Sequence, residues 1–366
     1  MSLLAEQNIP TKADVIILGG GVLGISAAYH LSQRRKSVLL LERETLPGSH
    51  ASGKNAGMFR KLYRNSTLTD WASRSQQTWP EIVRNQAFTE TPSLVVGRNL
   101  PSHHPGMFEE QAVKLRKKSA VLEVPAVYTK DDGLIDPGTY LQALLSLLDK
   151  SLVTVATRTT VTGLNYSGKD LVVDTNRNTT CRAPVVINAC GAWLNSPFRD
   201  NKQLLVQAEV FARHLFVVSG FPDQGLFFDP YGFYWDESLN WYLRRWEPKK
   251  RLISICDRLA ANPDRFEPPT NINEELAFKL VQAIPEHCSD LVIERAWHCF
   301  RTYTDDQLPI WGQDPTTPGL FWLSAFGGFG MSTSFAASAD LARLICGESV
   351  TVDPEFSVSR VRKKVH

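Results

Sequence analysis

Cysteine is scarce in this 366-residue sequence and does not occur in a metal-binding pattern. No two cysteines are paired as C-x-x-C, and no group of cysteine and histidine has the spacing of a zinc site. We therefore expect mostly buried thiols in a reducing, cytoplasmic compartment, and no bound metal. The cysteines are at positions 181, 190, 256, 288, 299 and 346.

A large excess of charge is also absent, because 40 basic residues face 38 acidic ones and the net charge is +2. A dedicated nucleic-acid binder usually carries a concentrated basic face, so we expect no nucleic-acid partner. The C-terminal "SRVRKKVH" is basic. We interpret it as a solvated tail, with a weak contact to a membrane surface as the alternative.

Long apolar runs are missing as well. Residues 1–14 contain no basic region followed by an apolar stretch, so we expect no signal peptide. The best apolar run, residues 15–28, is too short to span a bilayer, and we expect no integral membrane segment. The hydrophobic fraction of 43% is nevertheless ample for a core, in one large or two modest domains.

A glycine motif stands close to the start of the chain. Residues 15–18 are aliphatic and mostly β-branched, which predicts a strand buried on both faces of a parallel sheet. Gly19, Gly21 and Gly24 follow as G-x-G-x-x-G. In such a motif the first glycine permits a tight turn, the second lets the backbone approach a pyrophosphate, and the third lets the next helix pack closely.

A second buried strand is predicted over residues 38–41, with Glu42 at its end. A carboxylate in this place accepts hydrogen bonds from ribose hydroxyls and repels a 2′-phosphate. Strand, glycines, helix, strand and acid in this order predict a dinucleotide site rather than a coincidental turn. They do not distinguish a nicotinamide carrier from a flavin.

Three further stretches carry a family resemblance. They are "GSHASGKNAG" after Glu42, "PVVINACGAWLN" at 184–195 and "FWLSAFGGFGMSTSFAASADLARLI" at 321–345. Together with the first glycine motif, they resemble the D-amino acid oxidase-like family of FAD enzymes. "WYLRR" and "FRTYTDDQLPIWG" make the D-arginine and D-amino acid dehydrogenases, glycine oxidase and sarcosine oxidase the most similar types.

The resemblance implies an α/β fold with an interleaved second domain. A Rossmann-type FAD-binding domain would comprise residues 13–85, 133–205 and 296–366. A substrate-binding domain with a mostly antiparallel sheet would comprise residues 86–132 and 206–295. Helices are expected at 136–150, with Asp136 near the start, at 271–286, with Asn273 as the cap, and from about Ser332.

The resemblance also implies which residues contact FAD. A core position is the alternative for Val161, and a capping or core histidine is the alternative for His50. FAD would be bound non-covalently, because Arg301 stands where sarcosine oxidases carry the cysteine that bonds to the flavin. The implied contacts are Gly19, Gly21, Val22, Leu23, Gly24, Glu42, Arg43, Ser49, His50, Ser52, Asn55, Ala56, Gly57, Val161, Ala189, Gly191, Trp193, Arg301, Gly327, Gly328, Phe329, Gly330, Met331 and Ser332.

At the catalytic end, the resemblance assigns a substrate carboxylate to Arg301, whose planar guanidinium suits a planar carboxylate. An ion pair of this arginine with Asp305 is the alternative. Tyr242 would hold the other carboxylate oxygen, with Tyr234 as its rival, and an aromatic that only packs in the sheet is the alternative for either tyrosine. Arg213 and His50 match residues that lie near the substrate and the flavin in D-arginine dehydrogenases.

Two departures from the family pattern bear on the substrate and on oxygen. Ser93 stands where D-arginine dehydrogenase has a glutamate for a cationic substrate, so a neutral or aromatic substrate is favoured. Ile253 or Ser254 stands where sarcosine oxidases have a lysine that promotes reaction with O₂, which favours a dehydrogenase. The aromatic residues expected to line such a site are Phe59, Phe326 and Phe329.

The activity implied is oxidation of the C–N bond of an amino acid or secondary amino acid by hydride transfer to flavin N5. The imino acid product would then hydrolyse, and the electron acceptor is left open. One alternative is a 2-hydroxy acid or glycerol 3-phosphate dehydrogenase with the same fold. Others are a flavin-binding subunit without activity of its own and a nicotinamide enzyme.

Overall fold

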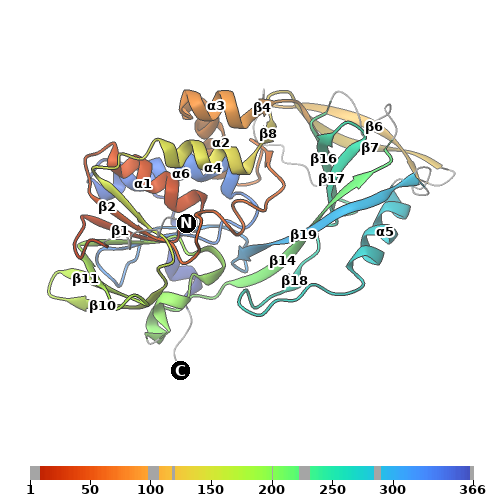
Figure 1. Cartoon of the computed structure of the whole chain (residues 1–366). Coiled ribbons are helices and arrows are strands. Elements are labelled where there is room, and N and C mark those ends of the chain that lie inside the picture. Colours follow the sequence, from red (N-terminus) through yellow and green to blue (C-terminus); the bar gives the residue numbers. More distant parts are fainter. Residues whose placement is uncertain are drawn as a thin grey trace, which may run out of the picture.

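The protein was analysed as a computed structural model, which describes residues 9–97, 107–117, 120–199, 201–221, 231–283 and 290–362. Cys288 and the last four residues of the basic C-terminal segment lie outside these ranges. Two bodies stand side by side, one built of sheets and helices and the other around one large sheet (Figure 1).

The first body is organised by a six-stranded sheet. The five strands from β21 to β9 are parallel to one another, and only the edge strand β20 is antiparallel to its neighbour β21. In spatial order the strands are β20 (Ile310–Gln313), β21 (Leu320–Ser324), β13 (Val185–Asn188), β1 (Val15–Leu18), β2 (Val38–Leu41) and β9 (Val153–Ala156).

Strand β1 shows why the central strands are apolar throughout. Val15 and Ile17 pack in the core cluster that contains helices α1 and α6, whereas Ile16 and Leu18 pack in a second cluster on the opposite face. That face is covered by an antiparallel sheet, so both sides of the central strands are buried, as expected for a parallel sheet. The covering sheet consists of β10 (Val161–Ser167), β11 (Asp170–Thr175) and β12 (Thr180–Ala183).

Helices cover the other face of the six-stranded sheet (Figure 1). The expected start at Asp136 is confirmed, because its carboxylate caps α4 by accepting a 2.7 Å hydrogen bond from the Thr139 amide. Helix α6 begins at Gly330, two residues before the expected Ser332. The helices of this body are α1 (Val22–Ser32), α2 (Ser66–Thr78), α3 (Glu81–Ala87), α4 (Pro137–Ser146) and α6 (Gly330–Ile345).

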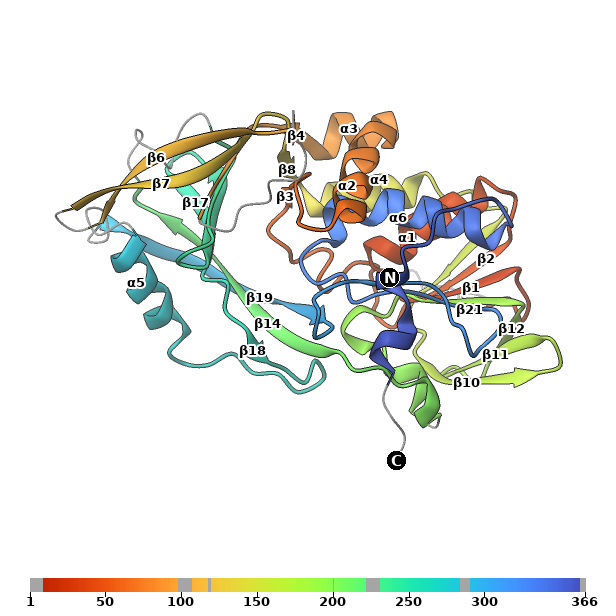
Figure 2. The same cartoon turned by 180° about the vertical axis from the view of Figure 1, so that it is seen from behind.

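A small three-stranded sheet borders these helices on the side that faces the second body (Figure 2). Its middle strand pairs antiparallel with both neighbours. The strands, in spatial order, are β3 (Met58–Phe59), β8 (Gly133–Ile135) and β4 (Phe88–Glu90).

The second body is built on a nine-stranded sheet. Its neighbours are antiparallel except β5 and β15, which confirms the expected mostly antiparallel sheet. The path is β18 (Leu259–Ala260), β14 (Glu209–Ser219), β17 (Lys250–Ser254), β16 (Trp241–Glu247), β15 (Phe233–Asp236), β5 (Ser93–Val96), β7 (Ala120–Thr129) and β6 (Glu109–Lys117), with β19 (Val292–Tyr303) beside β14.

The two faces of the nine-stranded sheet have different neighbours. One face packs on α5 (Ile272–Ala283) through Leu276 and Leu280. The other packs on the first body, where Ala56 joins a cluster with Tyr242 and Cys299. Because α5 begins at Ile272, Asn273 lies inside the helix, and its expected role as the cap is wrong.

Strands β14 and β19 pair along most of their length and extend from the first body to the far end of the second (Figure 2). The expected domain boundary at residue 296 therefore falls inside β19. In the part of the chain that the structure describes, no helix combines the length and apolar character needed to cross a membrane.

Candidate functional site

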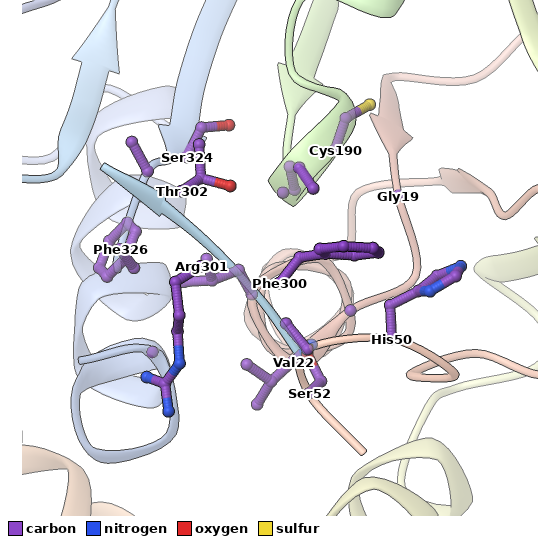
Figure 3. Close-up of a pocket in the computed structure, with 18 of the residues that line it drawn as sticks. Gly19, Val22, His50, Ser52, Cys190, Phe300, Arg301, Thr302, Ser324 and Phe326 are labelled. Carbon is purple, nitrogen blue, oxygen red and sulfur yellow. The ribbon is translucent and has the colours of Figure 1, made fainter. Parts of the chain in front are cut away.

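One cavity of about 730 Å³ lies where the two bodies meet. It extends from the ends of β1, β2 and β13 to the start of α6 and the facing side of the nine-stranded sheet. Figure 3 shows Gly19 and Cys190 at one part of its lining and Arg301 and Phe326 at another. Residues far apart in the sequence therefore share a single elongated site.

The first glycine motif forms the turn between β1 and α1. Gly19 has a φ of +103°, and a Cβ on it would lie 2.5 Å from the Ala189 carbonyl oxygen. A Cβ on Gly24 would lie 2.0 Å from the Gly19 oxygen, so this glycine serves helix packing and does not line the cavity. Gly21 and Val22 do line it, which places the N-terminal end of α1 at the cavity wall.

Glu42 lies at the end of β2 and is buried. Its carboxylate accepts hydrogen bonds from the amides of Gly20 at 2.8 Å and of Glu44 at 2.7 Å. Because a carboxylate offers about four acceptor positions, these two bonds orient Glu42 and leave capacity for the hydroxyls of a ribose.

The loop that carries "GSHASGKNAG" lies along the cavity and is held by local hydrogen bonds. The Ser52 hydroxyl accepts a 2.9 Å bond from the Val22 amide, which fixes the loop against the start of α1. The Glu44 carboxylate accepts a 2.9 Å hydrogen bond from His50 Nε2, and the His50 ring packs 4.5 Å from that of Trp193. His50 thus lines the cavity with one ring nitrogen already engaged.

A second turn follows β13 and opens toward the same space. Gly191 has a φ of +52°, and a Cβ on it would meet no atom within 4 Å. The preceding Cys190 is partly buried, and burial raises the pKa of its thiol to about 12. The thiol is therefore protonated at neutral pH, and the turn presents open backbone rather than a reactive group.

The third glycine turn leads from β21 into α6. Ala325 and Gly327 both have positive φ values, 58° and 46°. A Cβ on Gly327 would lie 2.3 Å from a ring carbon of Tyr303, and one on Gly328 would lie 2.9 Å from Arg301 Nη1. The turn therefore packs tightly on β19, while the start of α6 faces the cavity with its positive dipole end.

Arg301 lies on β19 directly beside this turn and points away from the strand, whereas Phe300 points toward His50 (Figure 3). Arg301 Nη1 donates to the Gly327 carbonyl at 3.3 Å, and Arg301 Nε is buried with no hydrogen-bond partner among the described residues. Within the described ranges it forms no ion pair, and Asp305 is exposed. The alternative of an Arg301–Asp305 pair is therefore wrong.

Tyr242 and Tyr234 lie on opposite faces of the nine-stranded sheet. Tyr234 packs on the α5 side, with its ring 5.7 Å from that of Trp241. Tyr242 lines the cavity and is 2% exposed, and its hydroxyl has no hydrogen-bond partner in the ranges that the structure describes. Burial raises the pKa of Tyr242 to about 12, so the hydroxyl remains a neutral donor at physiological pH.

Arg213 also reaches the cavity, from β14. It is 9% exposed, and its Nε donates to the Asp257 carbonyl oxygen at 3.1 Å. Asp257 in turn accepts from the His214 amide at 2.8 Å and contacts the His214 ring at 2.7 Å. This buried group fixes the base of the Arg213 side chain without neutralising its guanidinium.

Most of the residues expected to contact the cofactor line this one cavity. Two of the expected contacts, Gly24 and Ser332, do not line the cavity. The Ser332 hydroxyl instead accepts a 3.2 Å hydrogen bond from the Arg60 amide. The cavity lining includes Gly19, Gly21, Val22, Leu23, Glu42, Arg43, Ser49, His50, Ser52, Asn55, Ala56, Gly57, Val161, Ala189, Gly191, Trp193, Arg301, Gly327, Gly328, Phe329, Gly330 and Met331.

Only some of the residues expected to shape the substrate region line the cavity. Phe326 and Phe329 line the cavity, but Phe59 does not: it packs in the core against Trp79, at 5.1 Å between rings. Ser93 is buried and donates to the Asp132 carboxylate at 2.6 Å, outside the lining.

Ile253 and Ser254, which the resemblance set in the place of a lysine of sarcosine oxidases, do not line the cavity. Ile253 lies on the α5 side of the sheet, and the Ser254 hydroxyl donates to the His214 carbonyl at 2.9 Å. Among the residues that the structure describes, no lysine lines the cavity.

Several lining residues were missed from the sequence. Arg60 stacks on Trp235, with 4.4 Å from its Cζ to the ring centre. At the opposite end, Asp264 accepts from Trp193 Nε1 at 2.8 Å and contacts Arg43 at 3.2 Å. The only sequence signal for Arg60 is its place one residue after Phe59, since alternate residues of a short strand face opposite sides.

The cavity fits a dinucleotide that ends in a flavin. Open backbone at Gly191 and the exposed start of α1 provide the close approach and the amides that a pyrophosphate requires. Glu42 provides a ribose acceptor at the same end. At the other end, the start of α6 and the unpartnered polar atoms of Arg301 and Tyr242 leave hydrogen bonds for a further ligand. Within the described residues, no group of side chains is arranged to bind a metal.

Comparison with known proteins gives sequence relatives that match in part. Peroxisomal sarcosine oxidase of Mus musculus is 34% identical over 108 residues, which are 28% of this chain and 27% of that protein. Monomeric sarcosine oxidase of Bacillus sp. (strain NS-129) is 26% identical over 225 residues, 55% of each chain. The mitochondrial pyruvate dehydrogenase phosphatase regulatory subunit of Mus musculus is 24% identical over 378 residues, 91% of this chain and 41% of that protein. The matches thus span from about a quarter to about half of these relatives.

Solved structures share the fold over nearly the whole chain. Glycine oxidase from Geobacillus kaustophilus superposes with a TM-score of 0.80 at 20% identity, covering 96% of this chain and 99% of that one. L-proline dehydrogenase from P. horikoshii superposes with a TM-score of 0.81 at 18% identity, covering 96% and 98%.

A family model described as DAO, FAD dependent oxidoreductase, matches residues 14–344. This match spans the three glycine turns and both bodies of the fold, and it excludes the nicotinamide alternative that the first motif left open. The protein therefore belongs to the DAO family of FAD dependent oxidoreductases, as the resemblance in its sequence implied.

Proposed function

We propose that the protein uses FAD to oxidise the bond between the α-carbon and the nitrogen of an amino acid or secondary amino acid. The observation that carries the proposal is the pair of buried, unpartnered polar atoms at the cavity wall, Arg301 Nε and the Tyr242 hydroxyl. Leaving such groups unsatisfied costs about 1–3 kcal/mol each, so they favour a ligand that accepts hydrogen bonds.

A carboxylate suits both groups. A guanidinium binds the two oxygens of a carboxylate in one plane, and a neutral phenol donates to one of them. Tyr242 remains a donor because burial raises its pKa to about 12. Arg213 adds a second guanidinium at the same wall, held at its base by the Asp257 carbonyl. We assign substrate positioning to these three residues, since positioning contributes much of the rate in such reactions.

FAD would be held non-covalently by the glycine turns and by Glu42. When bound, it supplies a two-electron acceptor. The substrate loses two electrons and two protons, one from the α-carbon and one from the nitrogen, and a C=N double bond forms. Water then adds to the C=N bond and gives a 2-oxo acid and ammonia or an amine. The start of α6 favours negative charge that develops beside it.

We favour a dehydrogenase over an oxidase. The support is the lining itself, where no lysine is found among the described residues and neither Ile253 nor Ser254 reaches the cavity. The electron acceptor that restores the cofactor is then a quinone or another carrier rather than O₂.

The direct test is the visible spectrum of the purified protein during anaerobic titration. Flavin absorption should be present and should bleach on addition of an amino acid from a panel of glycine, sarcosine, proline and the D- and L-amino acids. Readmitted air should restore the colour slowly if the protein is a dehydrogenase. Bleaching by a 2-hydroxy acid or glycerol 3-phosphate, and by no amino acid, would instead establish the alternative substrate class.

The carboxylate anchor is tested with Arg301→Lys and Arg301→Ala. Lysine keeps the charge but loses the two-pronged geometry, so the apparent substrate affinity should fall in both variants and fall further in alanine. An unchanged affinity in Arg301→Ala would refute the assignment.

A second candidate function is a flavin-binding subunit without activity of its own. It is favoured by one similarity, because the mitochondrial regulatory subunit of Mus musculus described above aligns with 91% of this chain. This candidate would be supported by a protein that shows flavin absorption, is not bleached by any donor and co-purifies with a second chain.

A further inference from the structure

The charges around the cavity are unevenly distributed. The carboxylates that line it are Glu42 and Asp264, and both lie toward the end where the first glycine turn is found. Asp264 contacts Arg43 at 3.2 Å and Arg199 at 4.0 Å. Four other lining arginines form no ion pair with any carboxylate in the described ranges: Arg60, Arg213, Arg258 and Arg301.

Arg60 is separate from the proposed carboxylate anchor. Its Cζ lies 4.4 Å from the ring centre of Trp235 and 5.0 Å from that of Tyr63. The Trp235 ring lies 5.4 Å from the ring of Tyr242. One indole therefore stands between the Arg60 guanidinium and the phenol assigned to the α-carboxylate, and all three side chains line the cavity.

Asp132 and Glu237 interact electrostatically with Arg60, but within the described ranges neither forms an ion pair with it. Asp132 is buried, accepts from Ser93 and from the Lys61 amide, and has a pKa raised to about 6 by burial. Glu237 lies 3.9 Å from Arg64, and burial raises its pKa too. Neither residue belongs to the cavity lining.

We propose, building on the proposed function, that the substrate carries a second carboxylate on its side chain and that Arg60 binds it. The α-carboxylate would bind Arg301 and Tyr242, and the second group would reach past Trp235 to Arg60. One α-carboxylate leaves most of the unpaired positive charge of this region unmatched, whereas two carboxylates match it better. The same charges repel a cationic side chain, which agrees with Ser93 in place of an acid and with its position outside the lining.

The test compares acidic amino acids with their amides, which have nearly the same shape. Anaerobic flavin reduction is measured with aspartate and asparagine and with glutamate and glutamine, in both stereochemical forms. We expect at least one acid to exceed its amide about 10- to 100-fold in reduction rate at low substrate, the range for one charged hydrogen bond in a closed site.

In Arg60→Gln, the ratio of the flavin reduction rate with the acid to the rate with its amide should fall by that same factor. The matched control is Arg64→Gln, because Arg64 lies four residues away, has a side chain that is 68% exposed and does not line the cavity. Its ratio should equal that of the unchanged protein. Arg60→Lys keeps the charge and should keep part of the ratio.

A binding measurement makes the outcome independent of turnover. Glutarate and butyrate are titrated while the flavin absorption band is recorded, and glutarate should bind more tightly unless Arg60 is replaced. Equal acid and amide rates, together with equal binding of the two carboxylates, would overturn this inference but leave amino acid oxidation standing. If no amino acid reduces the flavin while glutarate still binds through Arg60, the proposed function fails and the second anion site stands.

Discussion

Replacement of Tyr242 by phenylalanine should stabilise the protein and weaken its activity. The hydroxyl is buried and has no hydrogen-bond partner in the described part of the chain, while the ring packs on Trp235 at 5.4 Å. Phenylalanine keeps that packing and removes only the unsatisfied oxygen. A substitution that raises stability but weakens substrate binding identifies a group that serves a ligand, because loss of a structural group would lower stability.

The magnitudes follow from the same atom. A buried hydroxyl without a partner costs about 1–3 kcal/mol, so its removal should raise the free energy of unfolding by about 1 kcal/mol after partial hydration is allowed for. A hydrogen bond from a neutral donor to a charged carboxylate contributes about 1.5–3 kcal/mol. Its loss should lower kcat/KM about 10- to 100-fold.

Tyr234→Phe is the matched control. Tyr234 lies on β15 beside β16 and is also buried, but it packs on the α5 side of the same sheet. Urea unfolding with saturating FAD gives the stability, and anaerobic flavin reduction gives kcat/KM for each variant. The control should leave kcat/KM unchanged.

A Tyr242→Phe protein that is less stable and reduces its flavin as fast as before would refute the assignment of the Tyr242 hydroxyl to a substrate. That result would mean that the hydroxyl has a structural partner and no contact with substrate. A loss of kcat/KM equal in both tyrosine variants would show a general effect of the sheet rather than a contact.

Three further outcomes are expected. Gly191→Val should raise the FAD dissociation constant about tenfold or more, because a β-branched residue is strained at a φ of +52° and its side chain enters the cavity; unchanged FAD titration of the apoprotein would contradict this. Burial lowers the pKa of His30 from 6.5 to about 4, so the unfolded chain binds the extra proton and stability should fall by about 2 kcal/mol from pH 7 to pH 5, a loss that His30→Gln removes. Burial raises the pKa of Asp132 from 3.8 to about 6, so the stability of Asp132→Asn relative to the unchanged protein should rise by about 2 kcal/mol from pH 4 to pH 7; a difference independent of pH would contradict it.

The cofactor end of the cavity was predictable because its contacts follow from short stretches of chain. Glycine is required at positions 19 and 24 because a Cβ there would lie 2.5 Å and 2.0 Å from a backbone oxygen, so the function of Gly19 and Gly24 is contained in residue type and spacing. Glu42 follows directly after a buried strand, and the end of that strand fixes its place. Such signals need no knowledge of how distant strands pair.

Element ends were less predictable than elements. Helix α5 begins at Ile272, one residue before the expected cap Asn273, and α6 begins at Gly330, two residues before the expected Ser332. A polar residue such as Asn273 can cap a helix or occupy its first turn, and local sequence does not separate the two.

The substrate end depends on pairings between distant strands. Phe59 was expected at the cavity and lies in the core, whereas its neighbours Met58 and Arg60 line the cavity. Alternate residues of a strand face opposite sides of it. An error of one position in predicting which residue faces the cavity therefore assigns a core residue to the site and a site residue to the core. Asp264 reaches Trp193 from a separate body, and no sequence pattern marks that contact.

The cofactor end and the substrate end of the cavity are built from different parts of the chain, and this affects how a protein of this fold changes its substrate. The glycine turns offer backbone and little side chain, so their motifs tolerate few substitutions and identify the family. Tyr242, Arg213 and Trp235 are side chains on one face of the nine-stranded sheet, while the opposite face packs on α5. Residues on the cavity face can be exchanged without disturbing the turns that would hold FAD or the core behind the sheet. Family membership therefore fixes the cofactor, and the arginines at the cavity wall carry the information about the substrate.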